Sequence, residues 1–169
     1  MKKFKLTSEF IVDISGVKLF RIKALIEFGN VKAGDLGGYI EKEENLSHMG
    51  DAWVFGDARV SGNARVSGDA QVFGNAWVSG NARVFGDAQV FGDARVSGDK
   101  DYAYAHGFGS CNRTTTFFRL KDGDVGVRCG CFYGTLAQFR DKVCETHGET
   151  KKAQEYLMLA DLMDFRFKN

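Results

Sequence analysis

A six-residue pattern of small, polar and apolar positions repeats eight times without interruption between residues 50 and 97. Each hexad reads Gly-(Asp/Asn)-Ala-x-Val-(Phe/Ser). Because alanine and valine are two positions apart, both point to the same face of an extended strand, and the x residue points to the other face. Glycine followed by aspartate or asparagine is typical of a turn. Each hexad therefore predicts a short strand followed by a corner.

A longer period of three hexads runs through the repeat. The residue after the valine repeats with this period, in three phenylalanines and three serines: Phe55, Phe73, Phe91, Ser61, Ser79 and Ser97. The x residues repeat in the same way, in the sets Trp53, Gln71, Gln89, then Arg59, Trp77, Arg95, then Arg65, Arg83. This order is expected when three six-residue sides close into one coil. The pattern predicts a triangular parallel β-helix with alanine and valine inside.

The segment before the coils predicts a cap. Two alternating apolar stretches are joined by turn residues at 13–16, which indicates a β-hairpin. A stack of about three coils exposes two ends, and repeat arrays need caps. We therefore expect residues 1–37 to form a hairpin cap and a lead-in loop.

The β-helix itself is expected over residues 38–100. The hexad phase extends backwards from Gly50, which places Ile40 and Leu46 at the alanine position. The repeat ends where Lys100 takes that position.

Residues 101–169 predict a separate, small α+β module of three strands and two helices. The strands are expected at 102–109, 114–120 and 125–132. Thr135 and Gln138 form a capping-box pattern that begins a helix, and Gly148 ends it. A second helix follows from about residue 150. The fold class is thus mainly β, with a hairpin before the β-helix and an α+β module after it.

Composition narrows the class of protein. The net charge of +1 points to no extended nucleic-acid partner. No stretch approaches the ~18 apolar residues of a membrane span, and the first residues lack the apolar core of a secretion signal. Four cysteines in such a chain are typical of reduced thiols, so we expect a cytoplasmic protein without a membrane partner. Cys129 and Cys131 are expected to share one face of a strand, which is not a zinc spacing, so no metal site is expected.

The hexads resemble those of the left-handed β-helix (hexapeptide-repeat) superfamily, whose best-known members are trimeric acyltransferases. More narrowly, FRIKALIEFGNVKAGDLGGYIEKEENLS, the coils, and GSCNRTTTFF with CGCFYGT together resemble a group of phage- and prophage-borne hexapeptide-repeat proteins. Those are often labelled transferases or polymer-forming proteins. The resemblance implies a left-handed coil, a trimer and, for a phage-encoded chain, a place in the host cytoplasm.

Acyltransferases of the superfamily rely on a histidine as general base, in a cleft between the coils of two subunits. No hexad between residues 50 and 97 contains histidine. His48 is expected at a valine position at the edge of the coils, and His147 in the last turn of a helix. His106 remains as the single fallback for a base. We therefore expect a protein that is not an enzyme of this kind and that needs no cofactor.

A candidate ligand site lies where the last strand passes into the first helix. The free N–H groups and dipole of a helix N-terminus attract anions, and arginine binds phosphate as a fork. The expected binding residues are Ser110, Arg113, Thr114, Thr115, Thr116, Arg128, Gly130, Phe132, Tyr133, Gly134 and Thr135. The alternative is structural, because threonine favours strands and Thr135 would cap a helix in any case.

Outward-facing aromatic residues predict an interface. The residues concerned are Trp53, Phe55, Phe73, Trp77, Phe85 and Phe91. A patch of this size is too apolar for the surface of a monomer, so a second subunit or the C-terminal helices are expected to cover it. The superfamily's packing favours a homotrimer.

These patterns favour a non-enzymatic binding protein, with a small phosphorylated or nucleotide ligand or a host protein as partner. Sequestration of such a ligand would interfere with host metabolism or defence. Two alternatives stay open: a CoA-dependent acyltransferase that uses His106, and a structural or assembly spacer.

Overall fold

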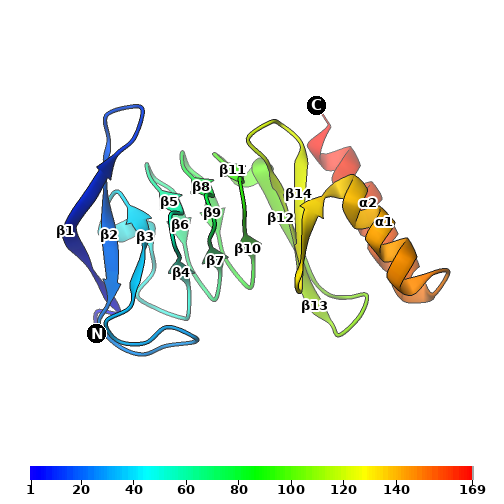
Figure 1. Ribbon diagram of the computed structural model, residues 1–169, viewed down its shortest axis with the longest axis horizontal. Helices are drawn as coiled ribbons and strands as arrows, with labels where there is room; N and C mark the ends of the chain where they lie inside the picture. The colour runs from blue at the N-terminus through cyan, green and yellow to red at the C-terminus, as the bar shows by residue number, and fades with distance from the viewer. Residues whose placement is uncertain (169) are drawn as a thin grey trace.

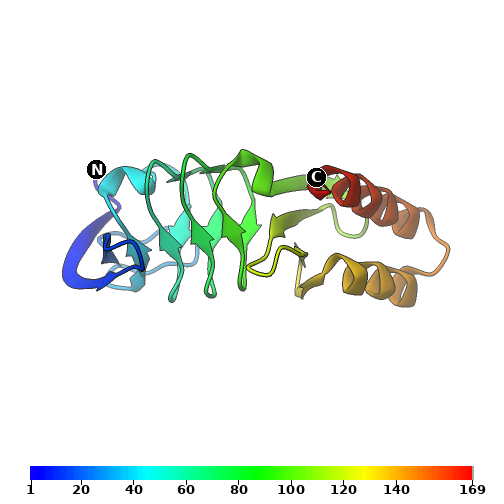
Figure 2. The same cartoon turned by 90° about the horizontal axis from the view of Figure 1, so that it is seen from above.

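The computed structural model describes residues 1–168. The protein is an elongated, mainly β structure of three parts in series: an N-terminal hairpin, a β-solenoid of about three coils, and a C-terminal sheet covered by two helices (Figure 1). A view from above shows the coils stacked between the two end parts (Figure 2). Within this described range, no helix has the length and apolar character needed to cross a membrane.

The hexads of residues 50–97 form two-residue strands, each made of the x residue and the valine. They are β4 (Trp53–Val54), β5 (Arg59–Val60), β6 (Arg65–Val66), β7 (Gln71–Val72), β8 (Trp77–Val78), β9 (Arg83–Val84), β10 (Gln89–Val90) and β11 (Arg95–Val96). Each strand pairs in parallel with the strand three hexads away, as Trp53 does with Gln71 and Gln71 with Gln89. The coil of three hexads is therefore confirmed.

The three sides of the coil differ in their outward residues. The phenylalanine side consists of β4, β7 and β10, and Phe55, Phe73 and Phe91 follow these strands. The tryptophan side consists of β5, β8 and β11, with Trp77 in the middle. The arginine side is the shortest, with only β6 and β9 in its sheet, and it places Arg65 directly beside Arg83.

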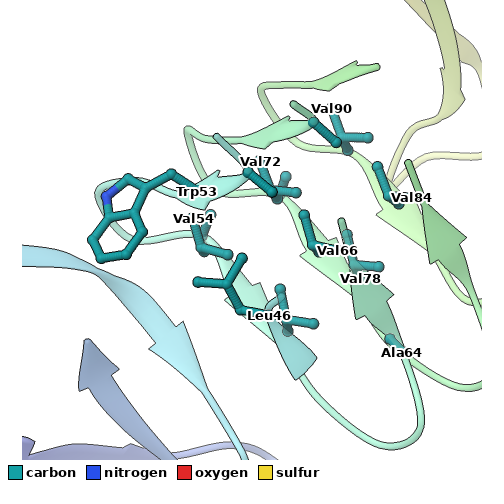
Figure 3. Packing of buried hydrophobic residues seen from close by; sticks show 14 of the residues in the cluster. Leu46, Trp53, Val54, Ala64, Val66, Val72, Val78, Val84 and Val90 are labelled. Atoms are coloured by element: carbon teal, nitrogen blue, oxygen red, sulfur yellow. The ribbon is translucent and has the colours of Figure 1, made fainter. Parts of the chain in front are cut away.

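Alanine and valine fill the interior of the coils. Every alanine and valine of the hexads from Ala52 to Val96 is at most 1% exposed. Figure 3 shows the valines grouped inside the coil, whereas the Trp53 ring points away from them. Each buried valine contributes about 1.5–3 kcal/mol of hydrophobic free energy. The predicted interior is confirmed.

The N-terminal hairpin lies against one end of the coils. Strands β1 (Phe4–Val12) and β2 (Lys18–Ala24) pair antiparallel, and the Asp13 carboxylate accepts bonds from the backbone of the turn. Strand β3 (Leu36–Ile40) pairs with β2 on one side and with β5 on the other. The hairpin thus extends the tryptophan side into a six-stranded sheet, β1-β2-β3-β5-β8-β11.

The expected positions of Ile40 and Leu46 were wrong. Ile40 pairs with Val60 and Leu46 with Val66, so both occupy the valine position, and each is two positions further from its partner than a regular hexad residue is. A short 3-10 helix, Glu43–Asn45, precedes Leu46. The two extra residues before the first regular hexad move His48 out of the coil interior, and its ring stacks on Phe4 at 4.3 Å.

The C-terminal part consists of a four-stranded antiparallel sheet and two helices. After a short 3-10 helix (Asp99–Asp101), the elements are β12 (Tyr102–Phe108), β13 (Arg113–Arg119), β14 (Val125–Cys129), β15 (Phe132–Thr135), α1 (Leu136–His147) and α2 (Lys151–Phe167). The sequence predicted one strand over 125–132. The chain instead reverses at Gly130, whose φ is +58°, and β15 returns antiparallel along β14.

The sheet joins the coils to the helices. One face packs on the open end of the coils, where Tyr102 and Phe118 belong to the same core as the valines. The backbone N–H of Gln89 donates to Thr116 Oγ1 at 2.9 Å, which satisfies a donor at that open end. The other face packs on α1 and α2 through a second core that contains Phe117 and Phe139. The module expected as a separate unit therefore closes the coil core.

The corner glycines generate a prediction about stability. Gly68 has a φ of +68°, and a Cβ there would lie 3.0 Å from the backbone nitrogen of Gly86 in the next coil. Gly56 has a similar φ of +57°, but a Cβ there would have no atom within 4 Å. We expect Gly56→Ala to lower the free energy of unfolding by about 1–2 kcal/mol through backbone strain alone. Gly68→Ala should lower it further, as measured by urea denaturation, and equal losses would contradict this account.

Lys3 generates a prediction about pH. Its buried ammonium donates to the carbonyls of Gly50 and Ala52, at 3.1 and 2.7 Å. Burial lowers the pKa of Lys3 to about 8, although Asp51 and Asp69 act in the opposite direction. The unfolded chain keeps this proton up to a pH of about 10, so the folded state gains stability relative to the unfolded state as pH rises from about 8 to about 10.

The variant Lys3→Met removes this titration. Denaturation of both proteins across that range should show the free energy of unfolding of the wild type rising relative to that of Lys3→Met. Parallel curves would show that the Lys3 pKa is the same in both states.

Candidate functional site

The residues expected to bind a ligand do not converge on one site. Successive side chains of a strand point to opposite faces of a sheet. Thr115, Cys129 and Phe132 lie on the face that packs against the helices, whereas Arg128 and Tyr133 contact the coils. The prediction placed both sets in one site, although they occupy opposite faces of the sheet.

The coil-facing residues connect the sheet to the phenylalanine side. The Arg128 guanidinium lies over the Phe91 ring at 4.7 Å and over the Phe73 ring at 5.6 Å. Tyr133 packs edge-on against Phe91, with ring centroids 4.7 Å apart. Thr116 is fully buried at the same junction. These contacts assign a structural role to this half of the predicted set.

The helix N-terminus is also occupied by its own cap. The Thr135 hydroxyl accepts from the backbone N–H of Gln138 at 3.2 Å, and the Gln138 side chain accepts from the backbone N–H of Thr135 at 2.9 Å. The capping box is confirmed. Gln138 and Phe132 also lie directly over Gly134, so the backbone is covered where an anion was expected to approach.

A pocket of about 260 Å³ on the helix side of the sheet gathers the remaining candidates. From the predicted set it contains Ser110, Arg113 and Phe132. The other lining residues come from the end of β14, the turn after it and the helices: Cys129, Cys131, Phe139, Lys142, Val143, Thr146, His147 and Tyr156. The helix residues were missed because their place beside the sheet depends on how α1 and α2 pack.

Arg113 is an exposed cation at this pocket. Gly130 leaves room for its guanidinium, because a Cβ at position 130 would collide with Arg113 Nη1. Within residues 1–168, no carboxylate lies within 4 Å of the Arg113 guanidinium. Lys142 is the second cation of the pocket, and its Nζ is 3.4 Å from Glu145.

Tyr156 holds the loop that carries Arg113. Its hydroxyl accepts from the backbone N–H of Ser110 at 3.0 Å and lies 3.2 Å from Ser110 Oγ. Burial raises the pKa of the Tyr156 phenol above its ordinary value, so the group stays protonated, and its O–H donates to the Ser110 carbonyl at 3.4 Å. A fixed hydroxyl pair therefore lies beside a free guanidinium.

The three histidines lie apart. His106 is on β12, with a side chain 58% exposed, and its Nδ1 is 2.8 Å from Thr114 Oγ1 and 3.8 Å from Asp87 Oδ2. His48 Nε2 lies 2.7 Å from Glu43 Oε1 in the N-terminal cap. His147 lines the pocket, with its ring 5.7 Å from that of Tyr156.

No group of three or more His, Cys, Asp or Glu side chains is placed to hold a metal ion in the described part of the chain. Cys131 lies in the turn after β14, so the expectation that it shares a strand face with Cys129 was wrong. The four thiols are free.

The predicted interface residues have different surroundings. Trp53 is 1% exposed, because Phe4 and Phe28 of the N-terminal part cover it, so its place in an exposed patch was wrong. Trp77 lies between the guanidiniums of Arg59 and Arg95, each 5.1 Å from its ring. Phe55, Phe73 and Phe91 form a half-buried phenylalanine ladder, with edge-on contacts between Phe55 and Phe73 and between Phe73 and Phe91. The C-terminal sheet, not the helices, contacts the Phe91 ring.

Phe85 differs from the other predicted interface residues because it remains open to solvent. Its exposed fraction is 49%. Its ring lies edge-on to Tyr104, with ring centroids 6.0 Å apart. It is therefore the most exposed aromatic side chain of the predicted interface set.

Stacked hexads closed by a cap at each end define a β-solenoid protein. A family model described as the YdcK Beta solenoid repeat matches residues 58–74, 70–86, 76–90 and 88–99. The match covers most of the coils and supports a β-solenoid repeat there. A comparison with curated proteins found no match.

Proposed function

We propose that the protein is a non-enzymatic binding protein that holds a small phosphorylated ligand in the pocket beside Arg113. The observation that carries the proposal is the guanidinium of Arg113, which is exposed at a pocket and has no carboxylate partner within 4 Å in residues 1–168. Arginine binds phosphate oxygens through two parallel N–H donors.

The rest of the pocket supports the same chemistry. Lys142 supplies a second positive charge, and Ser110 with Tyr156 supplies hydroxyl groups. Phe132 and Phe139, whose ring centroids are 5.6 Å apart, give an apolar wall suited to a base or sugar. The volume of about 260 Å³ is just below the range of about 300–1,000 Å³ for ligand pockets, which favours a small phosphorylated compound.

The resemblance to phage-borne proteins extends the proposal to a biological role. A phage-encoded protein of this kind would act in the cytoplasm of the host and sequester a nucleotide signal used in defence. A host protein bound by the C-terminal part is the alternative partner. This step depends on resemblance, because a fold does not define a function.

The variant Arg113→Gln tests the ligand site. Purified protein is denatured, the released small molecules are identified by mass spectrometry, and the phosphorylated compound found is titrated against wild type and variant. We expect an affinity loss of about 10- to 150-fold, equivalent to the roughly 1.5–3 kcal/mol of a charge-assisted bond. Arg140→Gln is the matched control, because Arg140 pairs with Asp161 and is not among the residues that line the pocket.

Two results would refute the ligand site. One is the absence of any phosphorylated compound that binds more tightly than about millimolar. The other is equal binding by Arg113→Gln and wild type. Either result would leave protein contacts as the mode of action of the C-terminal part.

We also propose a homotrimer. The solvent-exposed ring of Phe85 and the half-buried phenylalanine ladder leave apolar surface on the sides of the coils. Light scattering should give a mass near three times 18.7 kDa. A stable monomer at micromolar concentration would contradict the trimer.

A CoA-dependent acyltransferase is a second candidate, and the proximity of His106 to Asp87 is the observation that favours it. A carboxylate beside an imidazole can orient it as a general base. Steady release of CoA from acetyl-CoA that is lost in His106→Ala would select this function. Co-purification with virions would select the third candidate, a structural spacer.

A further inference from the structure

The arginine side of the coils carries an unusual pair of charges. Arg65 and Arg83 are in register on neighbouring parallel strands, and both side chains are exposed. Neighbouring strands are about 4.8 Å apart, and like charges directly opposite each other on a sheet are destabilising. In the described part of the chain, neither guanidinium has a carboxylate within 4 Å.

The other two sides show that the repeat does not require this pairing. The tryptophan side places the Trp77 ring between two arginines, which separates their charges. The phenylalanine side has Trp53, Gln71 and Gln89 at the same hexad position and carries no charge there. Two guanidiniums are adjacent only on the arginine side of these coils.

The two corner residues directly before the arginine pair also lack charge. The second position of the hexad is aspartate at all three corners before the phenylalanine side: Asp51, Asp69 and Asp87. At both corners before the arginine side it is asparagine, Asn63 and Asn81, joined by a hydrogen bond of 3.3 Å. The next corner of this series is Asp99, whose carboxylate accepts from the backbone N–H of Arg83 at 2.7 Å. Asparagine at positions 63 and 81 therefore leaves Asp99 as the acidic corner residue beside the pair.

A cleft of about 550 Å³ lies over this pair. Its charged lining consists of Lys42, Arg65 and Arg83 against one carboxylate, Glu44, and the two asparagines complete its polar surface. Lys42 belongs to the segment that leads into the 3-10 helix, and its Nζ donates to Asn63 Oδ1 at 3.3 Å. A neighbouring hollow shares Glu44 and Arg65, and its other acid, Glu43, is paired with Lys2 and His48.

We propose that this cleft is an anion site that takes a diphosphate group. A diphosphate presents oxygens of two linked phosphoryl groups, so each can bind one guanidinium of the stacked pair while Lys42 approaches from the wall. The anion offsets the repulsion between Arg65 and Arg83. The site is on the coils, and it stands independently of the C-terminal pocket.

Calorimetric titration with inorganic pyrophosphate at low ionic strength tests the site. The double variant Arg65→Gln/Arg83→Gln introduces glutamine, which already occupies the same hexad position at Gln71 and Gln89. We expect wild type to bind one pyrophosphate per chain at this cleft and the double variant to bind it on the order of tenfold to a hundredfold more weakly. Arg59→Gln/Arg95→Gln removes the same charge from the same hexad position on the tryptophan side and should bind as wild type.

A second variant tests the electrostatic argument without removing an arginine. Asn63→Asp/Asn81→Asp introduces the aspartate found at all three corners before the phenylalanine side, so the fold should tolerate it. The new carboxylates should neutralise the pair and reduce pyrophosphate affinity to a similar extent. Pyrophosphate should also raise the melting temperature of wild type and not that of either double variant.

Several outcomes would overturn the site. One is that pyrophosphate does not bind to wild type. Another is that it binds to Arg65→Gln/Arg83→Gln as tightly as to wild type. A third is that Arg59→Gln/Arg95→Gln loses as much affinity for pyrophosphate as Arg65→Gln/Arg83→Gln does. Loss of binding in Arg113→Gln alone would refute this cleft and support the C-terminal pocket. A change of assembly mass in Arg65→Gln/Arg83→Gln, with pyrophosphate binding unchanged, would identify the arginine side as a subunit interface instead.

Discussion

The backbone hydrogen bonds between coils are the constraint on which the structure depends. The backbone N–H of Phe73 donates to the carbonyl of Val90, for example, and each regular hexad forms such bonds with the matching hexad of a neighbouring coil. These bonds fix which side chains become neighbours, regardless of whether the contact is favourable. Stacked phenylalanines gain from the constraint and stacked arginines lose from it. Because the three sides share one backbone geometry, the outward residues of one side can be compared directly with those of the other two.

The same bonds create the problem solved at the two ends. A coil without a neighbour leaves N–H and C=O groups unpaired. At the N-terminal end the Lys3 ammonium reaches the carbonyls of Gly50 and Ala52. At the C-terminal end the Thr116 hydroxyl of the sheet accepts from the backbone N–H of Gln89. Tyr133 of the same sheet packs against Phe91, the last phenylalanine of the ladder. Both ends use side chains from outside the repeat to satisfy groups inside it.

Local chemistry in the sequence predicted the coils, the hairpin and both helices. The period of three hexads sorted the outward residues onto three sides, and the Thr135 capping box marked the start of α1. The sequence did not predict the two extra residues after Leu46 or the turn at Gly130, because a single insertion leaves no periodic signal. It also merged two faces of one sheet into one candidate site. Tertiary packing decides which face of the sheet contacts the coils, and the spacing of residues in the sequence gives no information about it.

The seating of Tyr133 on Phe91 has a consequence for how such a chain can change in length. Each hexad turns the chain by about one third of a revolution. Adding or deleting three hexads would lengthen or shorten the molecule by about 4.8 Å and present the same side to the sheet. A change of one or two hexads would rotate the terminal sheet and helices onto a side that lacks a phenylalanine ladder. The length of the molecule can therefore change only in steps of one whole coil if the contact between Tyr133 and the phenylalanine ladder is to be kept.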